Sequence, residues 1–446
     1  SSAPNGRRRQ GLFEHPVNDV CLYLSFFVIE IRLSWSNDTG NQDATVTDTV
    51  KTDRGPWTVF LIFLRLGLTS FGGPIAHLGY FRDELVTRRQ WLSERSYADL
   101  VALCQFLPGP ASSQVGIALG LSRSGYAGAL AAWAGFTLPS AIALILFALG
   151  IASYGDAMPS GVLHGLEVVA VAVVSQAVWG MARNLCPDAP RITIMAAATC
   201  IVLLVPSAWG QVAVIAIAAI IGLWMFKPRQ GAAHDPLPIA IRRRVGLFWL
   251  TLFFALLTGL PLLTAMFPNQ TLSMVDAFYR AGSLVFGGGH VVLPLLQAEV
   301  VPSGWVSNDA FLAGYGAAQA VPGPLFTFAA FLGASMNQAP SGWLGGLVCL
   351  LAIFAPSFLL VVGALPFWER LRGNTRTQAA LLGINAAVVG LLLAALYQPA
   401  WTSAIHAPRD FGLALVALVA LMSWKLPPWL IVVGGGMAGW LLSVTL

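Results

Sequence analysis

The chain has 446 residues, of which 57% are hydrophobic and 10% are charged, and its formal net charge is +5. Soluble domains carry roughly 25% charged residues, so the composition excludes an ordinary globular protein and predicts several membrane-spanning helices of about 20 apolar residues. The basic residues lie between the apolar stretches and report membrane topology, which argues against a nucleic-acid partner. Five cysteines are scattered without metal-ligand spacing, and we expect neither a metal site nor a cofactor.

Residues 1–55 differ from the rest of the chain. They begin with three arginines, Arg7 to Arg9, and end in a polar run over residues 36–55 that is too hydrophilic to bury a core. The apolar stretch over residues 20–31 is short and flanked by charges, which favours an interfacial helix over a span. We predict a loosely attached, poorly ordered extension.

The remainder contains an internal repeat. Phe71-Gly72-Gly73 recurs 215 residues later as Phe286-Gly287-Gly288, and Pro108-Gly109-Pro110 recurs 214 residues later as Pro322-Gly323-Pro324. The same registers pair single residues, namely Arg65 with Arg280, Gly67 with Gly282, Glu84 with Glu299, Trp91 with Trp305, and Gln105 with Gln319, and Pro139-Ser140 recurs 217 residues later as Pro356-Ser357. Ordered agreement over about 75 residues indicates a duplication.

Basic residues sort the connecting loops into two sides of the membrane. Residues 82–95, 227–244 and 370–376 are rich in arginine and lysine and are expected inside the cell, whereas residues 153–160 and 300–308 contain neither and are expected outside. These assignments agree if each repeat has two re-entrant helical hairpins, at the Phe-Gly-Gly and Pro-Gly-Pro motifs, followed by about four spanning helices. A linking helix then inverts the second repeat.

The predicted fold is therefore an all-α polytopic membrane protein with two inverted-topology repeats joined by a linking helix. Its predicted parts are an extension over residues 1–55, a first repeat over residues 56–226, a basic loop and linking transmembrane helix over residues 227–270, and a second, inverted repeat over residues 271–446. The four spans of the first repeat are predicted near residues 125–152, 161–182, 191–206 and 209–226.

The glycine and proline motifs are the candidate substrate site. A helix that breaks inside a bilayer leaves backbone groups that lipid cannot satisfy, so the break must face protein, water or substrate. A Pro-Gly-Pro break ends one helix and starts another, whose free N–H groups and positive dipole end suit an anion. Four such tips near the midplane are expected of a secondary transporter. The competing interpretation is that the glycines only permit tight helix packing.

We predict substrate-binding residues at all four tips. In the first repeat they are Phe71, Gly72, Gly73, His77, Gln105, Pro108, Gly109, Pro110, Ser112 and Ser113. In the second repeat they are Gly287, Gly288, Gly289, His290, Gln319, Pro322, Gly323, Pro324 and Thr327. His77 and His290 do not align with each other, and the two aligned glutamines either contact substrate or satisfy the broken backbone.

Two arginines fall within predicted membrane segments. Arg65 and Arg280 are related by the repeat and are added to the substrate-binding residues, because together they could balance a dianion. The alternative is an ion pair, for instance between Arg280 and Asp276 one helical turn earlier, or snorkelling to the interface.

Three acidic residues are candidates for proton coupling: Glu84, Glu299 and Glu167. A salt bridge with Arg88 would explain Glu84 equally well. Glu167 lies inside a predicted span and ranks lower.

These motifs resemble a known family. Residues 71–77, 81–82, 91–92 and 102–114 resemble the first domain of chromate ion transporters of the ChrA type in their two-domain form, and residues 285–294 and 314–324 resemble the second domain. The likeness extends over residues 56–446. It implies a multi-pass protein of the bacterial cytoplasmic (inner) membrane that exports chromate, confers chromate resistance, and is driven by membrane potential or a proton gradient. The long start before the first helix departs from the family pattern.

Several alternatives stay open. Chromate is a tetrahedral dianion close in shape to sulfate, so an inward carrier of sulfate or another oxyanion is the second interpretation, and a passive anion channel is a third. A membrane-embedded enzyme is disfavoured, because the sequence has no HExxH pair, GxSxG elbow or dinucleotide fingerprint. The expected partners are the small anion and the lipid bilayer, with a homodimer left open.

Overall fold

The computed structural model describes residues 55–71, 73–154, 160–227, 241–286, 289–368, 371 and 374–445. By its contacts the chain divides after Lys51, and the description concerns the unit from Thr52 to Leu446. Apart from Gly55, the predicted extension over residues 1–55 lies outside the described residues. Every regular element in the described part of the chain is helical, and six of these helices are long and apolar enough to span a membrane. The predicted all-α polytopic fold is confirmed.

The first repeat begins with four helices around the two motifs and continues with four longer ones. In chain order the helices are α3 (Pro56–Thr69), α4 (Gly73–Phe81), the π-helix η1 (Arg82–Arg88), α5 (Glu94–Phe106), α6 (Ala111–Tyr154), α7 (Ser160–Leu185), α8 (Ala189–Leu204) and α9 (Ala208–Met225). The linking helix α10 (Arg243–Met266) follows.

The second repeat has the same order, with short 3-10 and π segments at its breaks. Its helices are α11 (Gln270–Leu284), η3 (Gly289–Val291), α12 (Val292–Val300), α13 (Asn308–Ala320), η4 (Leu325–Thr327), α14 (Phe328–Ala334), α15 (Gly342–Ala364), η5 (Leu365–Phe367), α17 (Thr375–Ala395), η6 (Leu396–Trp401), α18 (Thr402–Ala404), α19 (Pro408–Met422) and α20 (Pro428–Thr445). Equivalent helices begin in the same way: Ser93 caps α5 and Ser307 caps α13, each hydroxyl accepting a backbone N–H three residues later.

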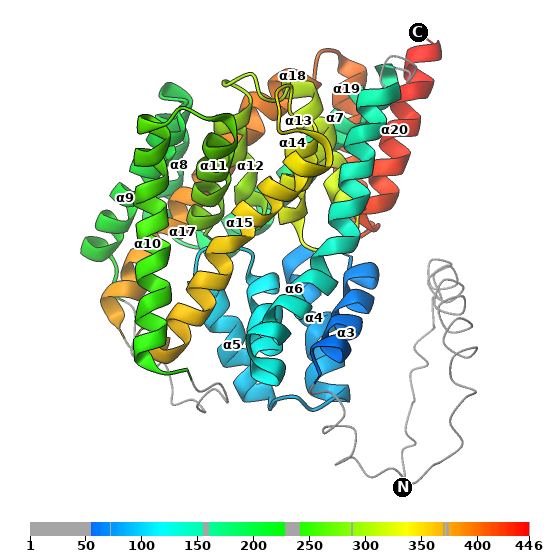
Figure 1. Cartoon of the computed structure of the whole chain (residues 1–446). Coiled ribbons are helices and arrows are strands. Elements are labelled where there is room, and N and C mark those ends of the chain that lie inside the picture. Colours follow the sequence, from blue (N-terminus) through cyan, green and yellow to red (C-terminus); the bar gives the residue numbers. More distant parts are fainter. Residues whose placement is uncertain are drawn as a thin grey trace, which may run out of the picture. The chain divides into compact units, whose positions relative to one another are not determined.

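The helix breaks fall at the predicted motifs. α3 ends at Thr69 and α4 begins at Gly73, while α5 ends at Phe106 and α6 begins at Ala111. In Figure 1, α3, α4 and α5 lie at the lower end of the unit, and their counterparts α11, α12 and α13 lie at the upper end. This placement agrees with an inverted second repeat. The sides of the membrane and the re-entrant course of the hairpins stay predictions.

Helix α6 is sharply bent. Its 44 residues would measure about 66 Å if straight, twice the thickness of the bilayer core. At Ser124 and Gly125 the backbone leaves the helical conformation, and Gly125 has a φ of +59°. The two arms then touch, since a Cβ on Gly120 would stand 2.2 Å from the carbonyl oxygen of Gly128. The second arm is the span predicted over residues 125–152, and the first arm is the helix that follows the Pro-Gly-Pro break.

The second repeat reproduces this packing with a different connection. Helices α14 and α15 take the places of the two arms of α6, and Gly333 contacts Gly345 as Gly120 contacts Gly128. The matched Gly67 and Gly282 let α3 lie against α6 and α11 against α15, because a Cβ on either would stand within 2.8 Å of a facing carbonyl oxygen.

The outward faces of the long helices are apolar. On α9 and α10 the large side chains exposed at the surface include Ile217, Ile220, Trp224, Phe248, Phe254 and Leu262. Such a surface suits hydrocarbon rather than water, in agreement with the composition. Helix α8, predicted as a span, has 16 residues and is shorter than the usual spanning length.

Candidate functional site

The two repeats cross at a pair of reciprocal hydrogen bonds. The Gly109 N–H donates to the Val285 carbonyl oxygen (N···O 2.7 Å), and the Gly323 N–H donates to the Ser70 carbonyl oxygen (N···O 3.0 Å). Gly109 and Gly323 are matched residues, and so are Ser70 and Val285, which directly precede the Phe-Gly-Gly motifs. Each Pro-Gly-Pro break is therefore joined to the Phe-Gly-Gly break of the other repeat. The four predicted tips meet.

Both central glycines are required by the geometry. Gly109 has a φ of +121° and Gly323 a φ of +107°, in the region that side chains with a Cβ rarely adopt. A Cβ on Gly109 would stand 2.8 Å from Ser357 Oγ, and one on Gly323 would stand 2.8 Å from Ser140 Oγ. Ser140 and Ser357 thus complete the crossing from the opposite repeat. The site residues predicted from the sequence do not include these two serines, although the matched Pro-Ser motif is a signal that points to them.

The crossing is polar and buried. Its buried polar side chains, each no more than 2% exposed, are Ser70, His77, Ser112, Ser113, Gln114, Thr137, Ser140, Thr327 and Ser357. Among the residues that the structure describes, several of their atoms have no hydrogen-bond partner: the hydroxyls of Ser70, Ser113, Thr137 and Ser357, the Gln114 Oε1, and the Nε2 of the neighbouring Gln319. Leaving a buried polar group unpaired costs about 1–3 kcal/mol. So many in one place indicate a site where a ligand or water completes the bonding.

Two carbonyl groups at the Pro-Gly-Pro breaks accept hydrogen bonds from side chains to which the sequence analysis assigns no such role. Gln114 Nε2 donates to the Pro108 carbonyl oxygen (2.6 Å), and Thr327 Oγ1 donates to the Pro324 carbonyl oxygen (2.8 Å). Gln105 is exposed at the end of α5 and is not among the buried side chains of the crossing.

The Phe-Gly-Gly side of the crossing brings both histidines near the centre in different ways. His77 Nδ1 stands 3.4 Å from Ser112 Oγ, and its ring meets Phe136 edge-on. His290 Nδ1 lies 2.7 Å from the buried Tyr315 hydroxyl. Phe71 and Gly73 flank the break, and Gly289 is buried close to Pro74 of the other repeat. The predicted site residues Gly72, Gly287 and Gly288 lie outside the described residues.

The two arginines are not brought together. Arg280 is buried on α11, where its Nη2 lies 2.6 Å from Asp276 Oδ2 and its Nη1 bonds Glu299. Its guanidinium carbon also stands 4.9 Å from the ring centroid of Trp209 on α9. Arg65 is exposed on α3. The ion-pair alternative is confirmed for Arg280, and the crossing is built without this pair.

Two of the three acidic candidates are held by arginine. Glu84 accepts from Arg88 (3.1 Å) and Arg89 (2.7 Å), which confirms the salt bridge weighed as its alternative role. Glu299 is committed to Arg280. Glu167 is buried on α7 and stands 3.6 Å from His164.

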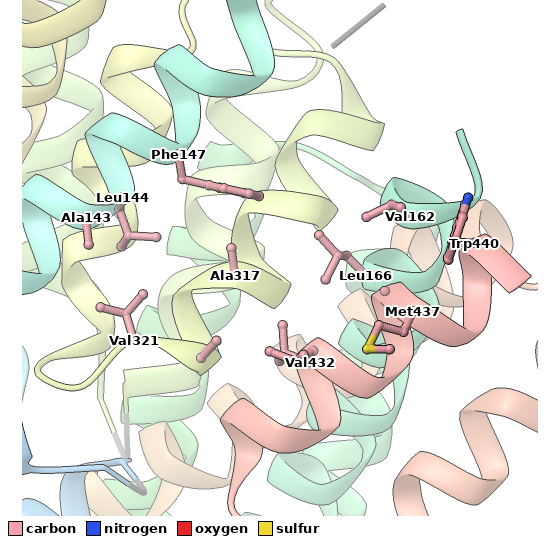
Figure 2. A pocket seen from close by; sticks show the side chains of 13 residues that line it. Ala143, Leu144, Phe147, Val162, Leu166, Ala317, Val321, Val432, Met437 and Trp440 are labelled. Atoms are coloured by element: carbon pink, nitrogen blue, oxygen red, sulfur yellow. The ribbon is translucent and has the colours of Figure 1, made fainter. Parts of the chain in front are cut away.

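An apolar cavity of about 480 Å³ adjoins the Pro-Gly-Pro break of the second repeat. Figure 2 shows its wall of aliphatic and aromatic side chains from α6, α7, α13 and α20. It is lined by Ala143, Leu144, Phe147, Val162, Leu166, Ala317, Ala320, Val321, Val432, Val433, Gly436, Met437 and Trp440. Such a lining offers a dianion almost no hydrogen-bond donor. The polar crossing is the better candidate for an anion.

The chain consists of two repeats of apolar helices that meet at a buried polar centre. This architecture places it among the multi-pass membrane proteins that are built from repeats, as secondary transporters are. The family model of chromate transporters matches residues 57–223 and 272–440, one match in each repeat. The chain belongs to the chromate transporter family.

Individual relatives agree with this assignment. The chromate transport protein of Pseudomonas aeruginosa is 29% identical over 412 residues, which cover 86% of this chain and 91% of that protein. The probable chromate transport protein of Synechococcus elongatus is 28% identical over 389 residues, covering 84% and 93% respectively. The uncharacterized transporter YwrB of Bacillus subtilis is 30% identical over 168 residues, covering 36% of this chain and 81% of that protein. No solved structure matches the chain.

Proposed function

We propose that this protein carries chromate out of the cell across the cytoplasmic membrane, and so confers chromate resistance. The observation that carries the proposal is the buried crossing, where the breaks of both repeats gather hydroxyl and amide groups that have no partner in the described part of the chain. Family membership and the names of the long relatives support chromate as the substrate.

The crossing offers a tetrahedral anion donors from both repeats. Ser70 and Ser113 come from the first repeat, and Ser357 and Gln319 come from the second. The long helix α6 begins at Ala111 and directs its free N–H groups and positive dipole end toward the same place. A dianion held in this way is stabilised by dipoles and hydrogen bonds rather than by the arginine pair.

Transport requires that the crossing open to each side in turn. Most polar side chains of the crossing are buried, and we assign this arrangement to the occluded state of the proposed cycle. Rocking of one repeat against the other would lengthen one of the two reciprocal bonds and expose the anion to one side. The two states interconvert around a fixed site.

Membrane potential supplies the driving force for export. Moving one elementary charge across the membrane is worth about 2.3 kcal/mol per 100 mV, so a dianion that leaves a negative interior gains about twice that amount. Glu84 and Glu299 are each held by arginine and are poorly placed to carry protons. We therefore assign no proton-carrying step to them.

Chromate uptake into everted membrane vesicles tests both the site and the driving force. Ser113→Ala and Ser357→Ala should each weaken the apparent affinity about tenfold or more, because a hydrogen bond to a charged group contributes about 1.5–3 kcal/mol. The exposed Ser443→Ala on α20 is the matched control. Parent-like affinity in both site variants would contradict the proposed site. Uptake that survives collapse of the potential but stops when the pH gradient is removed would contradict the driving force.

Sulfate is the second candidate substrate, because hydroxyl and amide donors discriminate poorly between tetrahedral dianions. Equimolar sulfate should lower chromate uptake only slightly if chromate is preferred. Loss of most of the uptake would instead favour a general oxyanion carrier.

A further inference from the structure

A second polar cluster lies away from the crossing, where α7 of the first repeat meets α19 of the second. His164 stands in the first turns of α7, His406 precedes α19, and Asp410 lies in the first turn of α19. Each residue offers one ligand atom, and the three atoms lie within 4.8 Å of one another. His406 is exposed and Asp410 is buried, so the cluster is open to solvent on one side.

The spacing of two of these atoms matches a shared metal ion. His164 Nε2 stands 3.2 Å from Asp410 Oδ1. Two ligand atoms bound tetrahedrally at about 2.0–2.1 Å to one zinc ion stand about 3.3 Å apart. The ring of His406 lies nearly parallel to that of His164, at an interplanar angle of 20° and a centroid distance of 5.8 Å. The ligand atom that His406 offers lies within 4.8 Å of those of His164 and Asp410.

The outer contacts of the cluster orient these ligands. His164 Nδ1 faces Glu167 Oε2 at 3.6 Å, and Nε2 is directed toward Asp410 Oδ1, the second proposed ligand atom. Asp410 Oδ2 accepts the backbone N–H of His406 (3.0 Å) and of Ala407 (2.9 Å), which fixes the carboxylate with Oδ1 toward His164. Metal ligands ordinarily have such outer partners: a ligating histidine contacts a carboxylate through its other ring nitrogen, and a ligating carboxylate accepts hydrogen bonds.

The charge balance also favours a cation. Glu167 and Asp410 are both buried, and Asp309 on α13 is close enough to act on Glu167 electrostatically. Arg409, whose Nε stands 3.9 Å from Asp410 Oδ1, is half exposed and offsets only part of this negative charge. A divalent ion between neutral imidazoles would supply the positive charge that protonation of His164, which faces both carboxylates, would otherwise provide.

We propose that His164 Nε2, His406 and Asp410 bind one zinc ion, with the fourth position open to water. Two imidazoles and one carboxylate suit zinc and similar transition metals rather than magnesium or calcium, which prefer oxygen ligands. The ion would fasten the start of α7 to the start of α19, and thus one repeat to the other. This site goes against our expectation from the sequence that the chain has no metal site.

Zinc titration of the purified full-length protein tests the proposal, with an affinity tag other than polyhistidine and after treatment with a chelator. Calorimetry should give one zinc ion per chain, and cobalt substitution should give the visible absorption of a tetrahedral site. His406→Ala should weaken zinc binding at least about tenfold and abolish the cobalt spectrum. His234→Ala, in the basic loop, is the control and should bind as the parent does.

His406 is exposed, so its replacement should leave folding intact, and the melting temperature without zinc checks this. His164→Ala provides a second variant that must show the same loss. The proposal is overturned if the parent binds no zinc at stoichiometric concentration. It is equally overturned if both variants bind zinc as tightly as the parent, because the ion would then occupy another place.

Discussion

The two repeats agree closely at the crossing and differ beside it. Gly109 and Gly323 make the same bond in opposite directions, and both have a positive φ. By contrast, the matched Arg65 and Arg280 have different surroundings: Arg65 is exposed, whereas Arg280 is buried between two carboxylates. Duplication has preserved the backbone geometry that builds the centre, while the charged side chains around it have diverged.

The divergence has a simple cause in the sequence. Asp276 precedes Arg280 by one helical turn, and the residue at the same register in the first repeat is Leu61. Without that acid, α3 offers Arg65 no carboxylate at i−4 spacing. The arginine that has a local partner is buried, and the one that lacks it is exposed.

The largest expected effect concerns the inverted orientation of the two repeats. Each labelled position should react from one side of the membrane only. Thr87 is exposed near the end of η1, and Ser303 is exposed in the turn after α12. In a variant with Cys21 and Cys200 replaced by serine, cysteines introduced at Thr87 and Ser303 should react with a membrane-impermeant maleimide from opposite sides. Cys104, Cys186 and Cys349 are buried and should stay unlabelled. Labelling of both positions from the same side of the membrane would show that the two repeats are not inverted.

Replacing either central glycine should cause a large loss of transport. Gly109→Ala and Gly323→Ala each add about 1–3 kcal/mol of backbone strain and a collision with the serine of the other repeat. Each should abolish most chromate uptake at matched expression. Gly180→Ala is the control, since a Cβ there meets nothing within 4 Å. If only one of the two central variants is impaired, the reciprocal bonds are not equivalent in function.

Replacing Arg65 and replacing Arg280 should have different effects on the stability of the protein. Arg280→Gln leaves the buried Asp276 and the partly buried Glu299 without their cation and should destabilise the protein by about 3–5 kcal/mol. Arg65→Gln, at an exposed position, should change stability by no more than about 0.5 kcal/mol. Thermal unfolding in detergent measures both. Adding Asp276→Asn and Glu299→Gln to Arg280→Gln should restore much of the loss, and failure to do so would point to another role for this arginine.

The smallest effect involves a surface ion pair that only the first repeat has. Arg82 Nε donates to Glu94 Oε2 at 2.8 Å, and the residues at the same registers in the second repeat are Gln297 and Asn308. The Arg82 guanidinium lowers the pKa of the Glu94 carboxyl. Its stabilisation is therefore present above the unfolded pKa of about 4.3 and is lost as the pH falls through the lower folded value. Arg82→Gln should narrow the difference in melting temperature between pH 7 and pH 3 slightly, and less so in high salt.

The sequence predicted the helix breaks well because proline and glycine act locally. The break before Gly73 and the break before Ala111 both appear at the expected motifs, and the repeat indicated which breaks correspond. The role of Gln114 was missed, because only the folded backbone shows that its amide reaches the Pro108 carbonyl. The ion pair within α11 could be read from its i, i+4 spacing, but the contact of Arg280 with Trp209 could not.

Contacts between side chains distant in sequence were beyond prediction. His164 and His406 are not at equivalent positions of the repeats, so neither spacing nor internal symmetry points from one to the other. The sharp bend of α6 was likewise read as two separate segments, because sequence periodicity does not show that the helix continues through Ser124. Both features depend on how the halves fold against each other.

The reciprocal bonds mean that neither half of this chain is complete alone. Cut apart in the linker between them, the first half would hold a Gly109 amide without its acceptor, and the second half would hold a Gly323 amide in the same condition. In each fragment the unpaired backbone groups at the break would face lipid, which cannot form hydrogen bonds with them. We therefore expect that the two fragments must associate in the bilayer before either can bind an anion.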